Sequence, residues 1–304
     1  MRLLTHIVAP EQEGWPLRRL LRQELRISGS FLSRLKWRPG AILVNGRPAT
    51  VAAVLHTGDA VTADVSDLPG DNPHIRPVAW PLDILWEDED LLVVNKPADM
   101  PIHPSFQNHG NTLADALTWH YQQHGEDFVY RCINRLDRDT TGLLIVAKHL
   151  LSASILSDMV GKREIHREYL AIVKGIPPEN GTISAPIGRK KGSAILREVN
   201  FETGEPAVTH FARLEIRNGL SLVSLKLETG RTHQIRVHMA SIGHPILGDQ
   251  VYGPQKCPFH LTGQTLHAKT LGFIHPRTGE YMEFEAPLPE YFEKLLHRLG
   301  SLQK

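Results

Sequence analysis

Cysteine and long apolar runs are scarce in this 304-residue sequence, and each scarcity excludes a class of protein. The only two cysteines, Cys132 and Cys257, are too few and too far apart for a zinc cage, so we expect two reduced intracellular thiols. No apolar run approaches the ~18 residues that span a bilayer, and the apolar stretch at the N-terminus is too short for a signal-peptide core. We therefore expect a cytoplasmic protein with no membrane contact.

Net charge is nearly absent as well, because 34 lysines and arginines oppose 33 aspartates and glutamates. This balance does not exclude nucleic-acid binding, since binding depends on where the charges lie. The composition, 41% hydrophobic and 22% charged, is that of an ordered globular protein. A chain of this length accommodates one large domain and one small module.

Proline, glycine, aspartate and asparagine crowd together in residues 66–73 without apolar periodicity, which is typical of a linker. We therefore divide the chain into an N-terminal module at 13–66, a linker at 67–79 and a larger domain at 80–295. There is no internal repeat with the period of a solenoid.

The small module has the pattern of two helices followed by two short strands. Leucines at positions 17, 20, 21 and 25 have helical spacing, and a second helix is predicted around residues 31–35. Residues 41–47 predict a strand that enters a tight turn at Asn45-Gly46, and residues 59–63 predict another strand.

Basic residues concentrate in this module. Residues 15–65 include eight basic and three acidic side chains, a local excess of +5 that the whole-chain total hides. Arg18 and Arg22 lie four positions apart and share a helix face, and Arg34 and Arg38 repeat the spacing. Such a surface can neutralise phosphates without reading base sequence, or it can be an ordinary solvated face.

The larger domain has the pattern of a sheet with few helices. A capping box at residues 112–115 opens a predicted helix. Predicted strands cover residues 83–87, 91–96, 143–147, 168–173, 208–214, 220–227 and 281–285. Because their connections vary too much for regular βαβ winding, we expect an α+β fold around a large, mixed but mostly antiparallel sheet.

A polar loop at residues 134–142 precedes one of these apolar strands. It brings Arg135, Asp137, Arg138 and Asp139 into five consecutive positions. A loop planted on a buried strand is a rigid platform for a reactive carboxylate. The same side chains could instead form a surface ion-pair network, and the loop alone leaves both interpretations open.

A second polar segment, residues 228–234, leads from a predicted strand into a predicted helix whose apolar face carries Ile235, Met239 and Ile242. Arg231 falls at the N-terminal end of this helix, where the helix dipole disfavours a cation. We therefore expect an anion beside Arg231, either a phosphate or a carboxylate.

Taken in order, the motifs of the larger domain resemble one enzyme family. LLVVNKPADMPIHP is followed by RLDRDTTGLLIVAK, REYLAIVKG, GRTHQIRVHMASIGHPILGDQVYG and LHAKTLGFIHP. This set resembles the RluA family of RNA pseudouridine synthases along residues 84–289. The small module, with ILVNG and HTGDAVTA, is similar to the S-four-type RNA-binding domain, a frequent companion of that catalytic domain.

The resemblance implies an isomerase that detaches uracil from ribose in folded RNA and re-attaches it through carbon 5. The family's catalytic aspartate falls on Asp137, its active-site tyrosine on Tyr169 and its active-site arginine best on Arg231. The aspartate could attack the ribose anomeric carbon or remove a proton from the sugar, and the sequence leaves both open. Isomerisation is redox-neutral and calls for no metal or cofactor.

The resemblance also implies contacts with structured RNA, with ribosomal RNA favoured and transfer RNA possible. The residues expected to make them are Arg135, Asn134 and Thr140 in the loop, and Arg18, Arg22, Arg34 and Arg38 in the module. No obligatory protein partner is evident, and the sequence does not determine the oligomeric state.

The sequence departs from the usual family pattern at four positions. Asn134 stands where histidine is common, Asp99 where glycine is frequent, and Arg167 and Glu205 where lysines are usual. None of these changes removes a proposed catalytic group. Asp99 and Glu205 add negative charge, which we expect to tune the RNA contacts.

Two other functions fit part of the pattern. An RNA-binding protein on the same scaffold, without isomerase activity, is disfavoured because Asp137, Tyr169 and Arg231 are all present. A metal-dependent RNA hydrolase would use His233 and His238, but a spacing of five puts these side chains on different helix faces.

Overall fold

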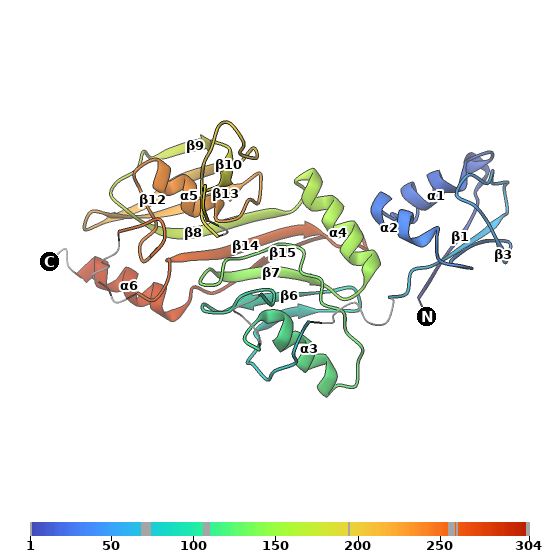
Figure 1. Ribbon diagram of the computed structural model, residues 1–304, viewed down its shortest axis with the longest axis horizontal. Coiled ribbons are helices and arrows are strands. Elements are labelled where there is room, and N and C mark those ends of the chain that lie inside the picture. The colour runs from blue at the N-terminus through green and yellow to red at the C-terminus, as the bar shows by residue number, and fades with distance from the viewer. Residues whose placement is uncertain are drawn as a thin grey trace.

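The structure is a computed structural model that describes residues 2–67, 74–105, 110–193, 195–254, 259 and 261–301, with no side chains described at 299–301. Its elements form a small N-terminal module and a large sheet domain, with helix α4 lying between the large sheet and the module (Figure 1). Within the described residues, no helix is long and apolar enough to cross a membrane.

The N-terminal module is a four-stranded sheet covered by two short helices. Its elements are β1 (Leu3–Ile7), the 3-10 turn η1 (Pro10–Gln12), α1 (Leu17–Gln23), α2 (Gly29–Leu35), β2 (Ile42–Val44), β3 (Arg47–Pro48) and β4 (Ala60–Asp64). Both predicted helices and both predicted strands are present. Asn45 and Gly46 join β2 to β3 with φ of 52° and 74°, the left-handed turn geometry that this residue pair favours.

The sequence analysis did not anticipate β1. The sheet order is β1-β4-β2-β3, and Leu3 of β1 pairs with Asp64 of β4. The start of the chain therefore belongs to the module sheet, ahead of the boundary predicted at residue 13.

The large domain is built on a nine-stranded sheet with the path β5-β6-β7-β14-β8-β13-β12-β9, from which β15 branches off by pairing with β14. Its elements are β5 (Ile84–Glu87), β6 (Leu91–Lys96), α3 (Leu113–Gln123), β7 (Thr141–Ala147), α4 (Leu150–Lys162), β8 (His166–Lys174), β9 (Asn180–Ser184), β10 (Ile187–Arg189), β11 (Arg197–Val199), β12 (Val208–Arg217), β13 (Leu220–Leu227), α5 (Gln234–Ser241), β14 (Leu266–Ile274), β15 (Tyr281–Glu285) and α6 (Glu290–Ser301). Every neighbouring pair is antiparallel except β7 with β14. The predicted α+β class is confirmed.

Strand β7 shows why the centre of the sheet is apolar on both faces. All seven of its residues are buried. Leu143 and Ile145 pack into the apolar cluster that includes α4, while Leu144 and Val146 pack into the cluster that includes α3. This alternation follows from the two-residue period of a strand, so β7 is a rigid base for the loop that precedes it.

Several elements follow no pattern that the sequence analysis recognised, notably α4, β14 and α6. Helix α6 continues past residue 295, where the domain was predicted to end, and its Phe292 packs against Ile172 and Leu247. In α5, Ile235 and Met239 are buried as predicted, whereas Ile242 follows the helix and is 37% exposed. Cys257 lies outside the described residues, and burial raises the pKa of the Cys132 thiol to about 11.

Candidate active site

A cleft of about 780 Å³ opens on the large domain where segments distant in sequence meet. Its walls include residues 101–105, the loop before β7, part of β8, the segment joining β13 to α5, and the C-terminal end of α4. The predicted residues Asn134, Arg135, Asp137, Tyr169 and Arg231 all line this cleft. Positions far apart in the sequence thus meet in one cavity.

The loop that carries Asp137 is held by its own polar residues. Asn134 is buried, and its side-chain oxygen accepts a hydrogen bond of 2.8 Å from the backbone N–H of Ile145. Thr140 is also buried; its backbone N–H donates to the carbonyl of Asp137 at 3.1 Å, and its hydroxyl accepts from Gln264 at 3.0 Å. These bonds brace the loop from the protein side. Contacts of Asn134 and Thr140 with RNA stay a prediction.

Gly142 lets the loop join the sheet at this point. Its φ is 105°, and a side-chain carbon there would lie 2.2 Å from the backbone oxygen of Ala268. Only glycine fits so close an approach, because any larger residue would separate β7 from its parallel partner β14. The glycine therefore fixes where Asp137 stands relative to the sheet.

The guanidinium that contacts Asp137 belongs to Arg236, in the first turn of α5. The distance from Arg236 Nη1 to Asp137 Oδ2 is 3.0 Å. The other side of Arg236 donates two hydrogen bonds, of 2.7 Å and 2.9 Å, to the buried carboxylate of Asp249. Because Asp249 fixes the guanidinium group through Nε and Nη2, Arg236 presents Nη1 to Asp137 in one orientation.

Ion pairing keeps Arg236 and Asp249 charged in spite of their burial. Burial alone would lower the pKa of Arg236, but the carboxylates of Asp249 and Asp137 raise it above its ordinary value. Burial would likewise raise the pKa of Asp249, and the hydrogen bonds and charge of Arg236 hold it below its usual range. An acid–arginine–acid chain therefore runs from the interior to the cleft.

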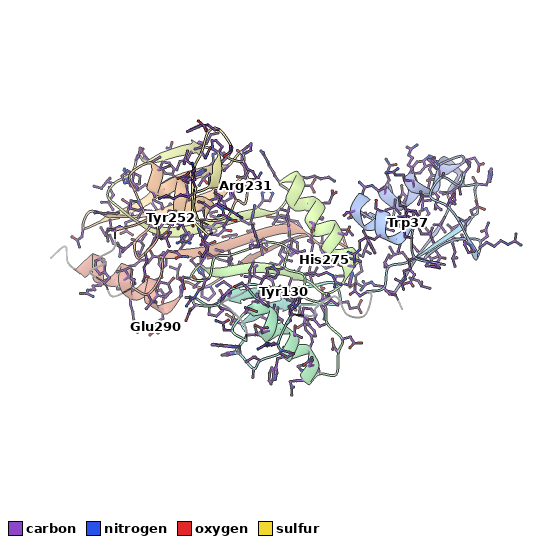
Figure 2. The ribbon with its side chains drawn as sticks, in the orientation of Figure 1. Trp37, Tyr130, Arg231, Tyr252, His275 and Glu290 are labelled. Atoms are coloured by element: carbon purple, nitrogen blue, oxygen red, sulfur yellow. The ribbon has the colours of Figure 1, made fainter. Side chains whose placement is uncertain are left out.

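Arg231 lies just before α5 with an anion beside it, as the sequence analysis expected, and its role as the active-site arginine stays a prediction. Arg231, labelled in Figure 2, precedes α5 by three residues and lines the cleft. It forms an ion pair with Glu205, and its Nε donates to the Pro206 carbonyl at 3.1 Å. The anion expected beside Arg231 is thus a carboxylate. The arginine that neutralises Asp137 is Arg236, a residue that sequence reasoning passed over.

Tyr169 lies on β8, on the floor of the cleft. Only 4% of the residue is exposed, and its strand is paired on both sides, with β13 and with β14. Burial raises the pKa of its phenol, and the nearby charge of Asp137 adds to the rise. The ring is therefore a rigid, neutral surface close to the carboxylate.

Further arginines surround the mouth of the cleft. Arg135 is exposed and reaches the Thr232 hydroxyl at 3.4 Å, whereas Arg163 forms an ion pair of 2.6 Å with Glu228. Arg167, noted from the sequence only as a departure from the family pattern, also lines the cleft and is half-buried. The rim thus carries several cations suited to phosphates.

The two histidines weighed as metal ligands have separate partners. His233 Nδ1 lies 2.9 Å from the Tyr252 hydroxyl, while both ring nitrogens of His238 bond elsewhere, to Thr209 and to the Ala185 carbonyl, each at 2.9 Å. Over the described part of the chain, potential metal ligands converge at Asp88, Asp90 and His275, away from the cleft. A hydrolytic metal site built on the two histidines finds no support.

One of the departures from the family pattern, Asp99, has a physical explanation. Asp99 adopts a φ of 58°, a left-handed conformation in which glycine costs least and aspartate is tolerated, and it forms an ion pair with Arg138. Next to it, Lys96 is 1% exposed and donates hydrogen bonds to the carbonyls of Pro97 at 2.7 Å and Arg138 at 2.8 Å. Lys96 thereby ties the end of β6 to the loop of Asp137.

The four arginines predicted as an RNA-binding face in the module have different environments. Arg38 forms an ion pair of 2.8 Å with Asp64, and Arg22 donates to the Ile27 carbonyl at 3.1 Å. Arg18 and Arg34 are exposed. Arg38 therefore has a structural partner, while Arg18, Arg22 and Arg34 present exposed positive charge.

The comparisons with known proteins identify the family of the chain. The family model described as RNA pseudouridylate synthase matches residues 90–241, which include the Asp137 loop, Tyr169 and Arg236. The chain belongs to this family and is an RNA pseudouridine synthase, an isomerase, as the resemblance predicted.

Particular relatives can also be named. A Bacillus subtilis protein named "Uncharacterized RNA pseudouridine synthase YlyB" is 44% identical over 266 residues, which are 86% of each chain. "Ribosomal large subunit pseudouridine synthase D" of Haemophilus influenzae is 43% identical over 233 residues, 73% of this chain and 72% of its own. Among solved structures, "Human RNA Pseudouridylate Synthase Domain Containing 4" is similar with a TM-score of 0.60 and 27% identity, covering 72% of this chain and 93% of its own.

Proposed function

We propose that this synthase converts uridines in structured ribosomal RNA into pseudouridine and that Asp137 is the catalytic residue. The observation that carries the proposal is the chain Asp249–Arg236–Asp137, which holds the carboxyl group of Asp137 in a fixed position at the wall of the cleft. The side chain of Asp137 is 23% exposed, so it is fixed on one side and accessible on the other. A carboxylate held in this way can act on a substrate in the cleft without being rearranged.

The chemistry requires one bond to break and another to form. The bond between uracil N1 and ribose C1′ breaks, the base rotates, C1′ bonds to C5, and the hydrogen of C5 is lost as a proton while N1 gains one. Asp137 could attack C1′ as a nucleophile or remove a sugar proton as a base, and both routes need its carboxylate held in a fixed position, which the bond from Arg236 supplies. Tyr169 would stack on the detached uracil, since its buried ring lies beside Asp137.

The arrangement of cations favours RNA that can give up a base from its stack. Arg135, Arg163, Arg167 and Arg231 surround the mouth of the cleft. A uridine must flip out to reach Asp137, and the cost of a few kcal/mol is smallest in loops and bulges. Several curated relatives are named for the large ribosomal subunit, which supports ribosomal RNA as the substrate, while transfer RNA remains a second candidate. We place the reaction in the cytoplasm.

The first test is Asp137→Asn. The substitution keeps the shape of the side chain and removes its charge, so we expect the rate to fall by at least about a thousandfold while RNA is still bound. The readout is release of tritium from RNA labelled at uridine C5, combined with pseudouridine mapping of ribosomal and transfer RNA in a deletion strain complemented by each variant.

Asp139→Asn is the matched control. Asp139 lies in the same loop, but its carboxylate faces Arg138 and Lys96 and does not line the cleft. We expect this variant to keep most of its activity. Normal tritium release by Asp137→Asn would refute the assignment of Asp137, and loss of mapped sites in transfer RNA alone would refute the ribosomal substrate.

A further inference from the structure

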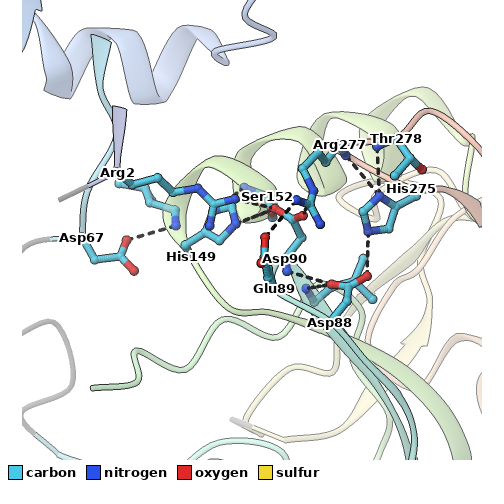
Figure 3. A network of polar contacts seen from close by, with 12 residues as sticks. Arg2, Asp67, Asp88, Glu89, Asp90, His149, Ser152, His275, Arg277 and Thr278 are labelled. Carbon is cyan, nitrogen blue, oxygen red and sulfur yellow. Dashed lines mark hydrogen bonds and ion pairs between the residues drawn. The ribbon is translucent and has the colours of Figure 1, made fainter. Parts of the chain in front are cut away.

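Both chain ends of the N-terminal module are anchored at the same point of the large domain. Arg2, just before β1, forms an ion pair of 2.8 Å with Asp90, in the turn between β5 and β6 (Figure 3). Asp67, just after β4, accepts a hydrogen bond of 3.0 Å from the backbone N–H of Leu150, the first residue of α4. The two ends are also joined to each other, because the Val65 N–H donates to the Arg2 carbonyl at 2.9 Å.

Asp90 is the centre of the first anchor. Its side chain is 2% exposed. Besides Arg2, Oδ1 accepts from His149 Nε2 at 2.7 Å and from the Ser152 hydroxyl at 3.1 Å, and Oδ2 faces Arg277 Nε at 2.6 Å. Nδ1 of His149 accepts the Ser152 backbone N–H at 3.2 Å, so the neutral tautomer, protonated at Nε2, suffices for the bond to Asp90. A buried carboxylate thus binds one arginine from each domain.

Asp67 provides the second anchor. It forms an ion pair of 3.1 Å with Arg131 of the large domain, and its negative charge lies at the N-terminal end of α4, where the helix dipole favours an anion. A further hydrogen bond joins the module to α4, because the Ser28 backbone N–H donates to the Ser154 hydroxyl at 3.2 Å. One continuous apolar cluster includes Leu32 of α2 and Ile155 of α4.

In this docked arrangement, helix α4 borders two cavities. A groove of about 460 Å³ between α2 and α4 is lined by Arg22 and Arg34 of the module and by Ser154 and Ser157 of α4. The C-terminal end of the same helix lines the cleft of Asp137, through Val160, Gly161 and Arg163. A single helix therefore separates the two cavities, and the angle at which the module docks decides where Arg22 and Arg34 lie relative to the cleft.

We propose that Asp90 and Asp67 are positioning residues that lock the N-terminal module onto α4, so that its basic groove and the catalytic cleft contact the same RNA strand. Asp90 acts through Arg2, and Asp67 acts through Arg131 and the first turn of α4. The inference rests on the proposed function, because RNA is the molecule that both cavities contact. A locked module adds its phosphate contacts to those of the cleft without an entropic cost at each binding event.

The test compares Arg2→Gln with Arg277→Gln. Both substitutions remove one arginine from Asp90, but only Arg2 crosses to the module, since Arg277 follows β14 of the large domain. With an unmodified large-subunit ribosomal RNA transcript, we expect Arg2→Gln to raise KM by roughly tenfold at unchanged kcat. Arg277→Gln should leave KM near the wild-type value, and Arg2→Lys should restore most of the loss.

A short stem-loop cut around the modified uridine separates positioning from direct contact. It fills the cleft without reaching the groove, so Arg2→Gln and wild type should process it alike. Equal KM values for Arg2→Gln and Arg277→Gln on the long transcript would overturn the proposal. So would an equal loss on both RNAs, because Arg2 would then contact the substrate itself.

Small-angle X-ray scattering of the free proteins tests the lock without any RNA. We expect a larger radius of gyration for Arg2→Gln than for wild type and for Arg277→Gln. An unchanged radius would contradict the lock. Absence of tritium release from wild type on every RNA would instead refute the proposed function, and the scattering result would stand apart from it.

Discussion

Asp137 and Asp90 are both aspartates bound to arginine, yet they differ in how much of the carboxylate is left open. Asp90 is 2% exposed, and its two oxygens face Arg2, His149, Ser152 and Arg277. Asp137 is 23% exposed, and among the described residues one side chain, that of Arg236, contacts it. Asp90 is thus enclosed on all sides, with three hydrogen bonds at Oδ1 and Arg277 beside Oδ2, which itself accepts no hydrogen bond, whereas Asp137 retains acceptor capacity toward the cleft.

The difference shows how one kind of ion pair serves two purposes. Burial alone would raise the pKa of Asp90, but the hydrogen bond from His149 and the charges of Arg2 and Arg277 outweigh it and hold the pKa well below the ordinary value. Asp90 is thus a permanent charge that joins segments. At Asp137, the support comes from one side through Arg236, and the other side is free for a reacting atom. Enclosure among opposite charges suits an anchor, and an open face suits chemistry.

The largest effect is expected at the partner of Asp137. Arg236→Gln leaves Asp249 buried without a counter-charge, so we expect a loss of roughly 3–5 kcal/mol in the free energy of unfolding and a fall in rate of roughly 100-fold or more. Arg231→Gln removes a half-exposed pair with Glu205 and should cost about 0–1 kcal/mol and little activity. Urea unfolding measures the stability of both variants, and tritium release measures their rates. The reverse ranking would return the catalytic arginine to Arg231.

A smaller effect is expected at Asp90, where a substitution should lower stability but leave turnover unchanged. Asp90→Asn removes the charge shared by Arg2 and Arg277, and we expect a loss of roughly 3 kcal/mol in the free energy of unfolding. Turnover of the short stem-loop by the folded variant should be normal, because Asp90 does not line the cleft. Thermal unfolding and kcat on that stem-loop are the two measurements. A stable but inactive Asp90→Asn would erase the distinction between the two aspartates.

Lys96 sharpens the comparison as a buried amino group that forms no ion pair with any described residue. Burial lowers the pKa of Lys96 from 10.5 to about 7, and the more distant aspartates only partly oppose this. Between these values the unfolded chain binds a proton that the folded chain has lost, so this group makes stability rise with pH, by up to about 1.4 kcal/mol per pH unit.

The rise should be visible in urea unfolding curves recorded between pH 7 and pH 9. Lys96→Met keeps the length of the side chain and cannot titrate, so its stability should lack this rise. Parallel pH profiles for wild type and Lys96→Met would mean that Lys96 keeps its proton in the fold.

Local patterns carried much of the fold. The helical spacing of Leu17 to Leu25, the Asn45-Gly46 turn and the capping box of Thr112 with Asp115 each act over a few residues, and each is present. Elements without such signals were missed. Strand β1 is defined by its backbone pairing with β4, since none of its side chains is buried, and β14 is held on both sides by strands distant in sequence.

The same distinction holds for the site. The motif order indicated Asp137 and Tyr169, and the structure brings both to one cleft. The choice between Arg231 and Arg236, five positions apart in one motif, depends on where α5 begins. Because the helix starts at Gln234, Arg236 is the residue whose side chain points between Asp249 and Asp137.

By itself, the sequence determined the family, the α+β class and the identity of the loop that carries the carboxylate, because these follow from motifs and periodicities within short segments. Only the tertiary structure decided which arginine meets Asp137 and how the module is anchored. The Arg236–Asp137 contact spans 99 positions and the Arg2–Asp90 contact spans 88. Contacts of that range depend on how the large sheet places segments distant in sequence side by side and on where the module docks, and no local pattern encodes either.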